Sequence, residues 1–450
     1  MEISLSELAD TSLSFLVKEG VDDAVIAANR SLSHQIRFSN NEVSISKRWH
    51  TVNLSVYLVK EKKIASTDLN DISSLDRVTA ALKDLLSFVN SMKENPEYRG
   101  ISEGGPFDYQ TIPQTYDPSI KDFPDYAIDN IEEAINAAMA EGATSSAGIL
   151  QWLDGEEFLK TTGNAEVDRQ RSHFLFQIRS FLSPTESGQG ICVGRDLATF
   201  NAAQAGQNAG ELARQSRGGK AAKGGTFNAI FAPTVVGDII GSAIEAANPF
   251  LVEAGRSWLG DKLGQQISSE EFSAYDDGTI PNGFRSAEAD AEGVPTKKTL
   301  LIENGVLKGL IHNTNTARKA ETESTGNAGL VLPENTNIAI DPGSYRFDEM
   351  IAESKSPTIY VSNCWYSRAA SPIEGVFSSV PRDAMFLIEN GEIQRPIREL
   401  RISDSYPNVM RNIIAIQNKV RQVKWWLEVI TPVFAPAIMI KDVKFTTGTQ

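Results

Sequence analysis

Histidine is the side chain that most often binds a catalytic metal or accepts a proton near neutral pH. This chain of 450 residues has four: His34, His50, His173 and His312. No two of them stand at the spacing by which a helix presents two metal ligands, and neither HExxH nor HExxxH occurs. A catalytic zinc ion needs about three protein ligands. The sequence therefore predicts no metal site and no cofactor, although a site built from residues distant in sequence stays open.

Two other chemical motifs are incomplete. Residues 219–226 resemble a phosphate-binding loop, but Gly225 stands where a lysine must follow the second glycine. No GxSxG elbow is present, and Cys364 has no histidine base that the sequence pairs with it. We expect a mobile loop at 219–226, a small buried or half-exposed side chain at Cys364, and no catalytic residue.

Acidic residues gather around the turn at residues 281–283. Asp276 and Asp277 precede it, and Glu288, Asp290 and Glu292 follow it. Paired carboxylates can transfer protons or bind a hard cation. Acids that form turns on a solvated loop are the commoner explanation, and both readings stay open.

The overall composition is that of an ordinary globular protein, with 41% hydrophobic and 22% charged residues. The net charge of −15 argues against direct nucleic-acid binding, which needs a basic face. Cys192 and Cys364 form no CxxC pair, which fits a reducing compartment. The N-terminal residues do not resemble a signal peptide, and no apolar run is long enough to span a bilayer. We expect a cytoplasmic protein with no membrane contact.

Hydrophobic spacing predicts the elements of the N-terminal half. A helix is expected at residues 4–19, followed by short β-prone runs at 23–28, 35–38, 43–46 and 52–59. Asn40 and Asn41 indicate a tight hairpin turn between two of these runs. Ser73 or Ser74 can cap a second amphipathic helix. This pattern is typical of helices laid on an antiparallel sheet.

The remaining chain contains a long connection and many hairpins. Residues 95–125 are rich in Pro, Gly, Asp and Tyr, and helices are expected at 126–141, 197–216 and 233–247. Two Asn-Gly hairpins, at 300–310 and 386–397, reflect either a duplication or a common turn used twice. The fold class predicted is α+β. Its regions are an N-terminal helix and antiparallel-sheet domain (1–95), a central α+β region with the connection (96–225) and a hairpin-rich, mostly β domain (226–450).

Four motifs in one order resemble the TldD/PmbA family, also described as modulators of DNA gyrase. They are the Ser-x-Leu and Lys-Leu-Gly run at 257–264, Asp-x-Glu-Gly at 290–293, the Glu-Asn-Gly hairpin at 303–305 and Ser-Thr-Gly-Asn at 324–327. Residues 388–404 are similar to the family's C-terminal portion. The resemblance covers most of the chain and is strongest from about 225 to 415.

The resemblance implies a two-subunit cytoplasmic protease. Its TldD-type subunit carries HExxxH on a helix just before the Ser and Lys-Leu-Gly run, with a cysteine near the C-terminus as a further ligand. The corresponding helix here is 234–247, where the two histidine positions fall near Ile240 and Glu245. The late segment holds Trp425 and Trp426 and no cysteine. The chain therefore resembles the PmbA/TldE-type subunit, which lacks the metal motif.

This resemblance implies a metal-free partner that completes the complex and helps to hold an unfolded peptide, which can add a strand to a sheet edge. It also implies a TldD-type partner subunit and self-association when that partner is absent. A polar and aromatic run and a later pair of residues are the expected peptide contacts: Asn363, Cys364, Trp365, Tyr366, Arg368, Arg382 and Asp383. A loop whose aromatic side chains pack inward is the alternative for these residues. The alternatives for function are an independent peptidase that uses Cys364 and a non-enzymatic regulator of a DNA gyrase or toxin–antitoxin system.

Overall fold

Six long strands with alternating side chains form the first sheet. The computed structural model describes residues 3–70 and 72–447. The sheet has the order β3-β2-β1-β4-β5-β6, and every neighbouring pair is antiparallel. Its strands are β1 (Asp23–Ser39), β2 (Glu42–Lys60), β3 (Lys63–Leu69), β4 (Ser145–Thr161), β5 (Glu166–Ser183) and β6 (Glu186–Gly194). The short runs expected from sequence are thus parts of strands more than twice as long.

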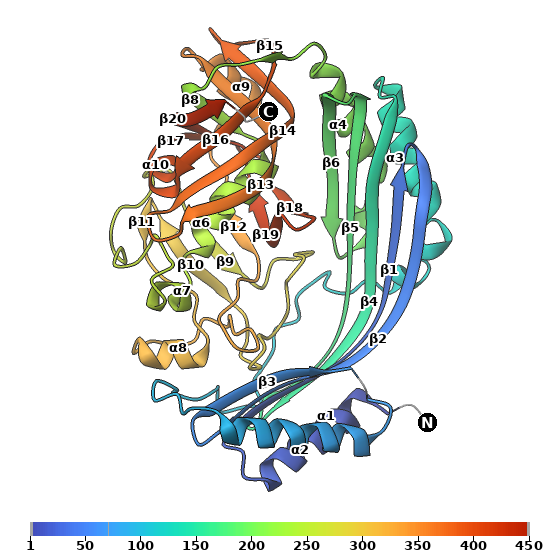
Figure 1. The fold of residues 1–450 in the computed structure, drawn as a ribbon, viewed down its shortest axis with the longest axis vertical. Helices are drawn as coiled ribbons and strands as arrows, with labels where there is room; N and C mark the ends of the chain where they lie inside the picture. The colour runs from blue at the N-terminus through green and yellow to red at the C-terminus, as the bar shows by residue number, and fades with distance from the viewer. Residues whose placement is uncertain (1–2, 71, 448–450) are drawn as a thin grey trace.

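Helices cover one face of this sheet, as Figure 1 shows. Ala24 and Ile26 of β1 pack against the first two helices, whereas Val25 lies on the opposite face, because successive side chains of a strand alternate. Ser4 caps the first helix and Ser74 caps the second. The helices are α1 (Leu5–Lys18), α2 (Leu75–Ser91), α3 (Ala127–Ala140) and α4 (Ala202–Gln215). The uncovered face is directed toward the C-terminal half.

The sheet joins the first two predicted regions. β1 pairs with β4 from Val25 opposite Thr161 to Phe38 opposite Gly148, so strands from 1–95 and 96–225 lie in one layer. The connection between them is irregular apart from the short turns η1 (Pro118–Lys121) and η2 (Phe123–Asp125), and η3 (Leu197–Thr199) precedes α4. Tyr109 of the connection donates its hydroxyl proton to the Gly293 carbonyl at 2.8 Å. The connection therefore also contacts the C-terminal half.

Five strands of the C-terminal half close into a ring, because β13 pairs with both β8 and β14. They are β8 (Gly225–Phe231), β13 (Thr358–Ser371), β14 (Val376–Glu389), β16 (Leu400–Ser405) and β20 (Ile438–Thr447). β15 (Glu392–Arg398), β7 (Lys220–Ala221) and β17 (Ile413–Ile416) extend this sheet. Residues 220–221, expected in a mobile loop, are instead paired with β15.

A second sheet has the order β11-β10-β9-β12-β19-β18, which leaves β18 as an edge strand. Its strands are β9 (Ala274–Asp277), β10 (Lys298–Glu303), β11 (Val306–Leu307), β12 (Ile338–Ile340), β18 (Arg421–Trp425) and β19 (Val429–Ala435). One helical segment is packed in the same core as both sheets. It consists of α5 (Pro233–Val235), the π-helical turn η4 (Val236–Ile240) and α6 (Gly241–Glu245).

The remaining helices are short: α7 (Pro249–Glu253), α8 (Thr314–Lys319), α9 (Phe347–Ala352) and α10 (Tyr406–Arg411). Both Asn-Gly hairpins are confirmed, since Asn304 and Asn390 turn with φ of 48° and 54°, each followed by a glycine with positive φ. The α+β class with a strand-rich C-terminal half is also confirmed. In the described part of the chain, no helix has the length and apolar character needed to cross a bilayer.

Candidate functional site

The seven residues expected to contact peptide lie on two neighbouring strands. Five are on β13 and two, Arg382 and Asp383, are on β14. Antiparallel pairing places Asn363 opposite Arg382 and Trp365 opposite Val380. Residues separated by about 20 positions in the sequence therefore form one site, which we call the β13–β14 site.

The inner part of this site binds the N-terminal sheet. The Asp383 carboxylate is fully buried and accepts from Arg179 Nε at 2.6 Å and from Ser187 Oγ at 2.7 Å. Asn363 Nδ2 donates to the other Asp383 oxygen at 3.1 Å and also to Gln189 Oε1. A buried carboxylate is stable only with such partners. These bonds fasten β14 to β5 and β6.

The outer part of the site is accessible. Tyr366 and Arg368 are exposed, whereas Trp365 and Arg382 are half-buried. The Arg382 guanidinium lies 5.6 Å from the Trp365 ring centroid and 5.2 Å from that of Tyr366. An arginine over aromatic faces gives a flat surface with both cationic and apolar character.

Two residues of this site adopt the left-handed region of the backbone. Tyr366 has φ of 57° and Asp383 has φ of 64°. This conformation costs energy for residues other than glycine, and such strain gathers at binding and catalytic sites. The observation favours a functional role for the irregular part of β13, where the pairing register shifts between Trp365 and Arg368.

Behind the site lies a buried chain of polar groups. Ser367 Oγ donates to Asp238 Oδ2 at 2.6 Å and lies 2.7 Å from Ser379 Oγ. Burial raises the pKa of Asp238 to about 7, although its bond with Ser367 opposes the rise. Burial also raises the pKa of the Cys364 thiol well above its ordinary value, and Asp238 adds to the effect. A fully buried, protonated thiol is a poor nucleophile.

The positions where the resemblance implies metal ligands are occupied by other groups. Ile240 is fully buried in the apolar core. Glu245 is bonded to Thr431, and burial raises the pKa of its carboxyl. Trp425 is also fully buried, against Trp365 at 5.0 Å between ring centroids. These side chains do not fit a zinc ion, and among the described residues no three His, Cys, Asp or Glu side chains lie close enough to hold one.

The acidic cluster is buried, which corrects the expected solvated loop. Asp276 is fully buried and accepts from Asn327, Asn335 and Thr336 at 2.6–3.2 Å. Asp290 accepts three main-chain N–H bonds, each at 2.9 Å, from residues 292, 294 and 328. Because these oxygens are already bonded, the carboxylates stabilise loops and are not available to bind a cation.

A cavity of about 480 Å³ lies beside the β13–β14 site. Gln189 of β6, Ser362 of β13 and Val423 of β18 are among its lining residues, so the edge strand β18 borders it. Its volume is in the range of cavities that hold small ligands or side chains.

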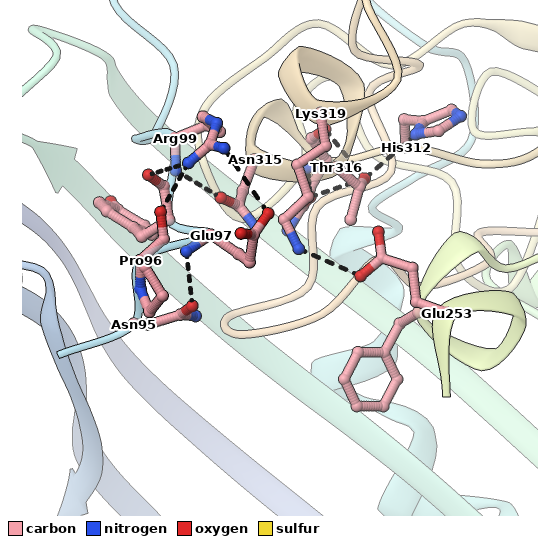
Figure 2. Close-up of polar contacts among 12 residues, drawn as sticks. Asn95, Pro96, Glu97, Arg99, Glu253, His312, Asn315, Thr316 and Lys319 are labelled. Carbon is pink, nitrogen blue, oxygen red and sulfur yellow. Dashed lines mark hydrogen bonds and ion pairs between the residues drawn. The ribbon is translucent and has the colours of Figure 1, made fainter. Parts of the chain in front are cut away.

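Another cavity, of about 380 Å³, lies between residues 95–101 and α8, and Figure 2 shows polar residues at its border. Lys319 Nζ pairs with Glu253 Oε2 at 3.1 Å. His312 Nδ1 is 3.2 Å from Thr316 Oγ1, and burial lowers the pKa of this histidine. His312 therefore has a structural bond and stays neutral at pH 7.

Sequence reasoning did not find Arg179, Ser187, Gln189 or Asp238. The first three belong to β5 and β6, about 175 to 205 positions before their partners, and no local pattern predicts such pairing. Asp238 carries a weak signal, because a lone carboxylate within the apolar run 235–244 must be either bonded or protonated.

Two family profiles match the chain. The PmbA/TldA metallopeptidase C-terminal domain matches residues 224–447, and PmbA/TldA metallopeptidase domain 1 matches residues 24–87. A metalloprotease of Methanothermobacter thermautotrophicus is 29% identical over 306 residues, which are 65% of this chain and 66% of that protein. A metalloprotease of Methanocaldococcus jannaschii is 33% identical over 198 residues, 43% of each chain. Each match spans less than two thirds of the relative's own length.

Solved structures share the whole fold. A protein of Thermotoga maritima described as a modulator of DNA gyrase has a TM-score of 0.86 at 23% identity, covering 98% of this chain and all of that one. TldE of Thermococcus kodakarensis has a TM-score of 0.82 at 20% identity, covering 98% and 99%. At these identities the likeness shows the fold.

Proposed function

The chain belongs to the PmbA/TldA metallopeptidase family, and we propose that it is a metal-free, non-catalytic partner subunit of a TldD/TldE-type cytoplasmic metalloprotease. One observation carries this proposal. The helical segment 233–245 has no histidine, since none occurs between His173 and His312. Ile240 fills an apolar core there, which is an ordinary packing role. The chemistry then belongs to the partner chain, which would supply the metal.

The subunit's own task is to hold an unfolded peptide. Tyr366, Arg368 and Arg382 offer accessible aromatic and cationic groups, and Trp365 supports them. Asn363, Cys364 and Asp383 are buried and position these contacts from below. Among the described strands β18 pairs only with β19, and an extended peptide could add to its other side.

Reconstitution with a TldD-type chain tests the proposal. We expect hydrolysis of an unfolded peptide by the two chains together, stable association on a sizing column, and little hydrolysis by either alone. The Tyr366→Ala and Arg382→Ala variants should raise KM with little change in kcat, because they remove substrate binding and no reacting group. Glu132→Ala on the outer face of α3 is the matched control. Equal activity of the partner with and without this chain would refute the proposal.

Self-association of the isolated chain is part of the proposal. Residues 42–50 of β2 are all exposed, and β3 pairs only with residues 54–60, which leaves this part of the edge without a described neighbour. Free strand edges favour pairing with another chain. Light scattering should give a dimer mass, and a monomer at all concentrations would reject this part.

A regulatory role without proteolysis is the second candidate, because the similar Thermotoga protein is described as a modulator of DNA gyrase. A pull-down that recovers gyrase or a toxin–antitoxin protein, with no protease subunit, would support it. The third, a peptidase that uses Cys364, is disfavoured by the burial of that thiol.

A further inference from the structure

A polar cavity lies between the uncovered face of the N-terminal sheet and the C-terminal half. Its volume is about 540 Å³. Asn53, Asn29, Glu157 and Arg169 follow one another across β2, β1, β4 and β5 in register, so one row of side chains lines the sheet wall. The sheet and the C-terminal half face each other in Figure 1.

Apolar contacts close the space on either side of this polar band. Val25 and Leu159 pack with Ala289 on one side, and Leu175 and Val193 pack with Phe284 on the other. The polar side chains between these contacts lie on the face of the sheet opposite the helices. Apolar side chains at these positions would also have packed against the C-terminal half. Because polar groups there reduce the stability of the contact between the halves, they need another explanation.

Arginine is the distinctive residue of this cavity. Arg195 is 5% exposed, and its bonds go to main-chain carbonyls: Nε donates to Ser172 at 2.9 Å and Nη1 donates to Ser286. On the opposite wall, Arg285 Nη1 donates to the Asn335 carbonyl at 3.1 Å. Among the described residues, neither guanidinium has a carboxylate within 4 Å.

The acidic residues near the cavity form no close ion pair with either arginine in the described part of the chain. They act at longer range: Glu288 opposes the lowering of the pKa of Arg195, and Arg285 lowers the pKa of Glu245. Glu157 forms ion pairs with Arg169 and with Arg171, the latter at 3.5 Å. Asp290 accepts hydrogen bonds from three main-chain N–H groups. Glu334 is exposed. Glu288 is the one inner carboxylate of the lining without a described bond.

The neighbouring titratable groups also reflect an excess of positive charge. Burial lowers the pKa of Arg195 to about 9. Arg169 and Arg171 add to the effect, and Glu288 opposes it. His173 precedes Phe174, which pairs with Gly194, the residue before Arg195. Burial and Arg195 lower the pKa of His173 to about 3. Lys424, 5.1 Å from the Phe284 ring centroid, has a pKa lowered to about 8 by burial and by Arg285. A bound anion would relieve this repulsion.

We propose that this cavity binds a carboxylate, held between Arg195, which directly follows β6, and Arg285 of the C-terminal half. The planar fork of a guanidinium matches a carboxylate. The volume accommodates more than a lone ion, and the amides of Asn29 and Asn53 can bond to the rest of the ligand. The free C-terminus of a short peptide and a small dicarboxylic acid are the two sources of such a group.

Calorimetry on the full chain tests the site with three probes: tetra-alanine with a free C-terminus, the same peptide amidated, and succinate. Binding of the free peptide but not of its amide identifies a peptide terminus. Binding of succinate without the peptide identifies a small diacid. No binding of either acid, or equal binding of the amide, overturns the proposal.

Variants locate the ligand in the cavity. Arg285→Gln should weaken binding roughly tenfold or more, because a hydrogen bond to a charged group is lost. Glu288→Gln should tighten it, because a nearby negative charge is removed. The controls Arg395→Gln and Glu132→Gln change the net charge equally on exposed surfaces. If the controls shift affinity as much as the cavity variants, the site is excluded. Arg285 is preferred to Arg195 because it is less buried, so its variant should fold.

The carboxylate site can exist whether or not the chain is a protease subunit. If the ligand is a peptide C-terminus, however, the site adds a peptide contact to the proposed subunit role. Carboxylate binding together with failure to support a partner's peptidase activity would reject the subunit role alone. Activity with the partner and no carboxylate binding would reject this site alone.

Discussion

Asp238 is a buried carboxyl group whose hydrogen bond and raised pKa affect the stability of the fold. It lies on the π-helical turn, bonded to Ser367, with Glu428 and Glu245 as the nearby like charges and Arg368 as the nearby cation. Its folded pKa of about 7 lies above the ordinary value of 3.8. The folded state therefore holds a proton that the unfolded state releases, and stability falls as pH rises between these values.

Asp238→Asn should remove this pH dependence. We expect the free energy of unfolding of the natural chain, relative to the variant, to decline from about pH 4 to pH 7 and to be constant above that. The decline is at most about 4 kcal/mol for a shift of this size. Urea unfolding of both proteins at several pH values measures it. Parallel stability curves would show that Asp238 ionises normally in the folded protein.

Cys364 should be unreactive in the native protein. Its thiol is fully buried with a raised pKa, so iodoacetamide should modify it only after denaturation, as mass spectrometry of the tryptic peptide will show. Cys364→Ala should leave kcat of the reconstituted complex unchanged, because the buried thiol is not a nucleophile. Rapid native labelling, together with activity lost in the alanine variant, would instead support an independent thiol peptidase.

At the scale of elements, side-chain bonds between strands that are distant in sequence hold the two halves together. Asp383 of β14 and Arg179 of β5 form a buried pair. Asp383→Asn keeps a residue that tolerates positive φ but removes the charge, which leaves Arg179 without its carboxylate. We expect a loss of roughly 3 kcal/mol in the free energy of unfolding.

The exposed pair of Arg346 and Asp348 provides the control, since both side chains are more than 60% exposed. Asp348→Asn should cost less than about 1 kcal/mol in the same assay. Similar losses in the two variants would mean that the β5–β14 tie contributes no more than a surface ion pair.

Close packing of α4 on β6 depends on glycine. A Cβ at Gly190 would lie 1.9 Å from the Ala205 carbonyl oxygen, so Gly190→Ala must displace the helix. We expect a loss of about 1–3 kcal/mol, measured by urea unfolding. Gly219→Ala, where the nearest atom is 3.3 Å away, should change stability by less than about 1 kcal/mol. Equal losses of stability in the two variants would contradict the close packing of α4 against Gly190.

The sequence predicts local elements well and their assembly poorly. Helices α1 and α3 begin and end within two residues of expectation, and the Asn-Gly turns are where their positive φ requires them. The 17-residue strand β1 was expected as two short runs, because polar residues such as Asn29 and Ser31 interrupt its hydrophobic pattern. Asn29 lines the polar cavity, so the local signal is weak where the sheet faces polar space.

The β13–β14 site illustrates the same limit for function. The aromatic and charged run from Asn363 to Arg368 is visible in the sequence, and so is the missing histidine pair. The division of that run into a buried part and an accessible part depends on β5 and β6, whose pairing across the molecule no short motif encodes.

At the scale of the whole molecule, the fold is that of the PmbA/TldA family, and Ile240 and Trp425, near the positions where the resemblance implies metal ligands, are buried in the apolar core. Two halves face each other across the polar cavity, and within the residues that the structure describes no strand pairs with the outer side of residues 42–50 of β2. This arrangement fits the proposal that the chain shapes a site for a partner chain.

Metal content tests this account most directly. The isolated chain, an isolated TldD-type partner and their complex would each be incubated with excess zinc, desalted and analysed by inductively coupled plasma mass spectrometry, with peptide hydrolysis measured on the same samples. We expect metal to be retained in proportion to the partner chain, none to be retained by the isolated chain, and unfolded peptide to be hydrolysed by the complex. A stoichiometric metal ion in the isolated chain, accompanied by hydrolysis, would contradict it.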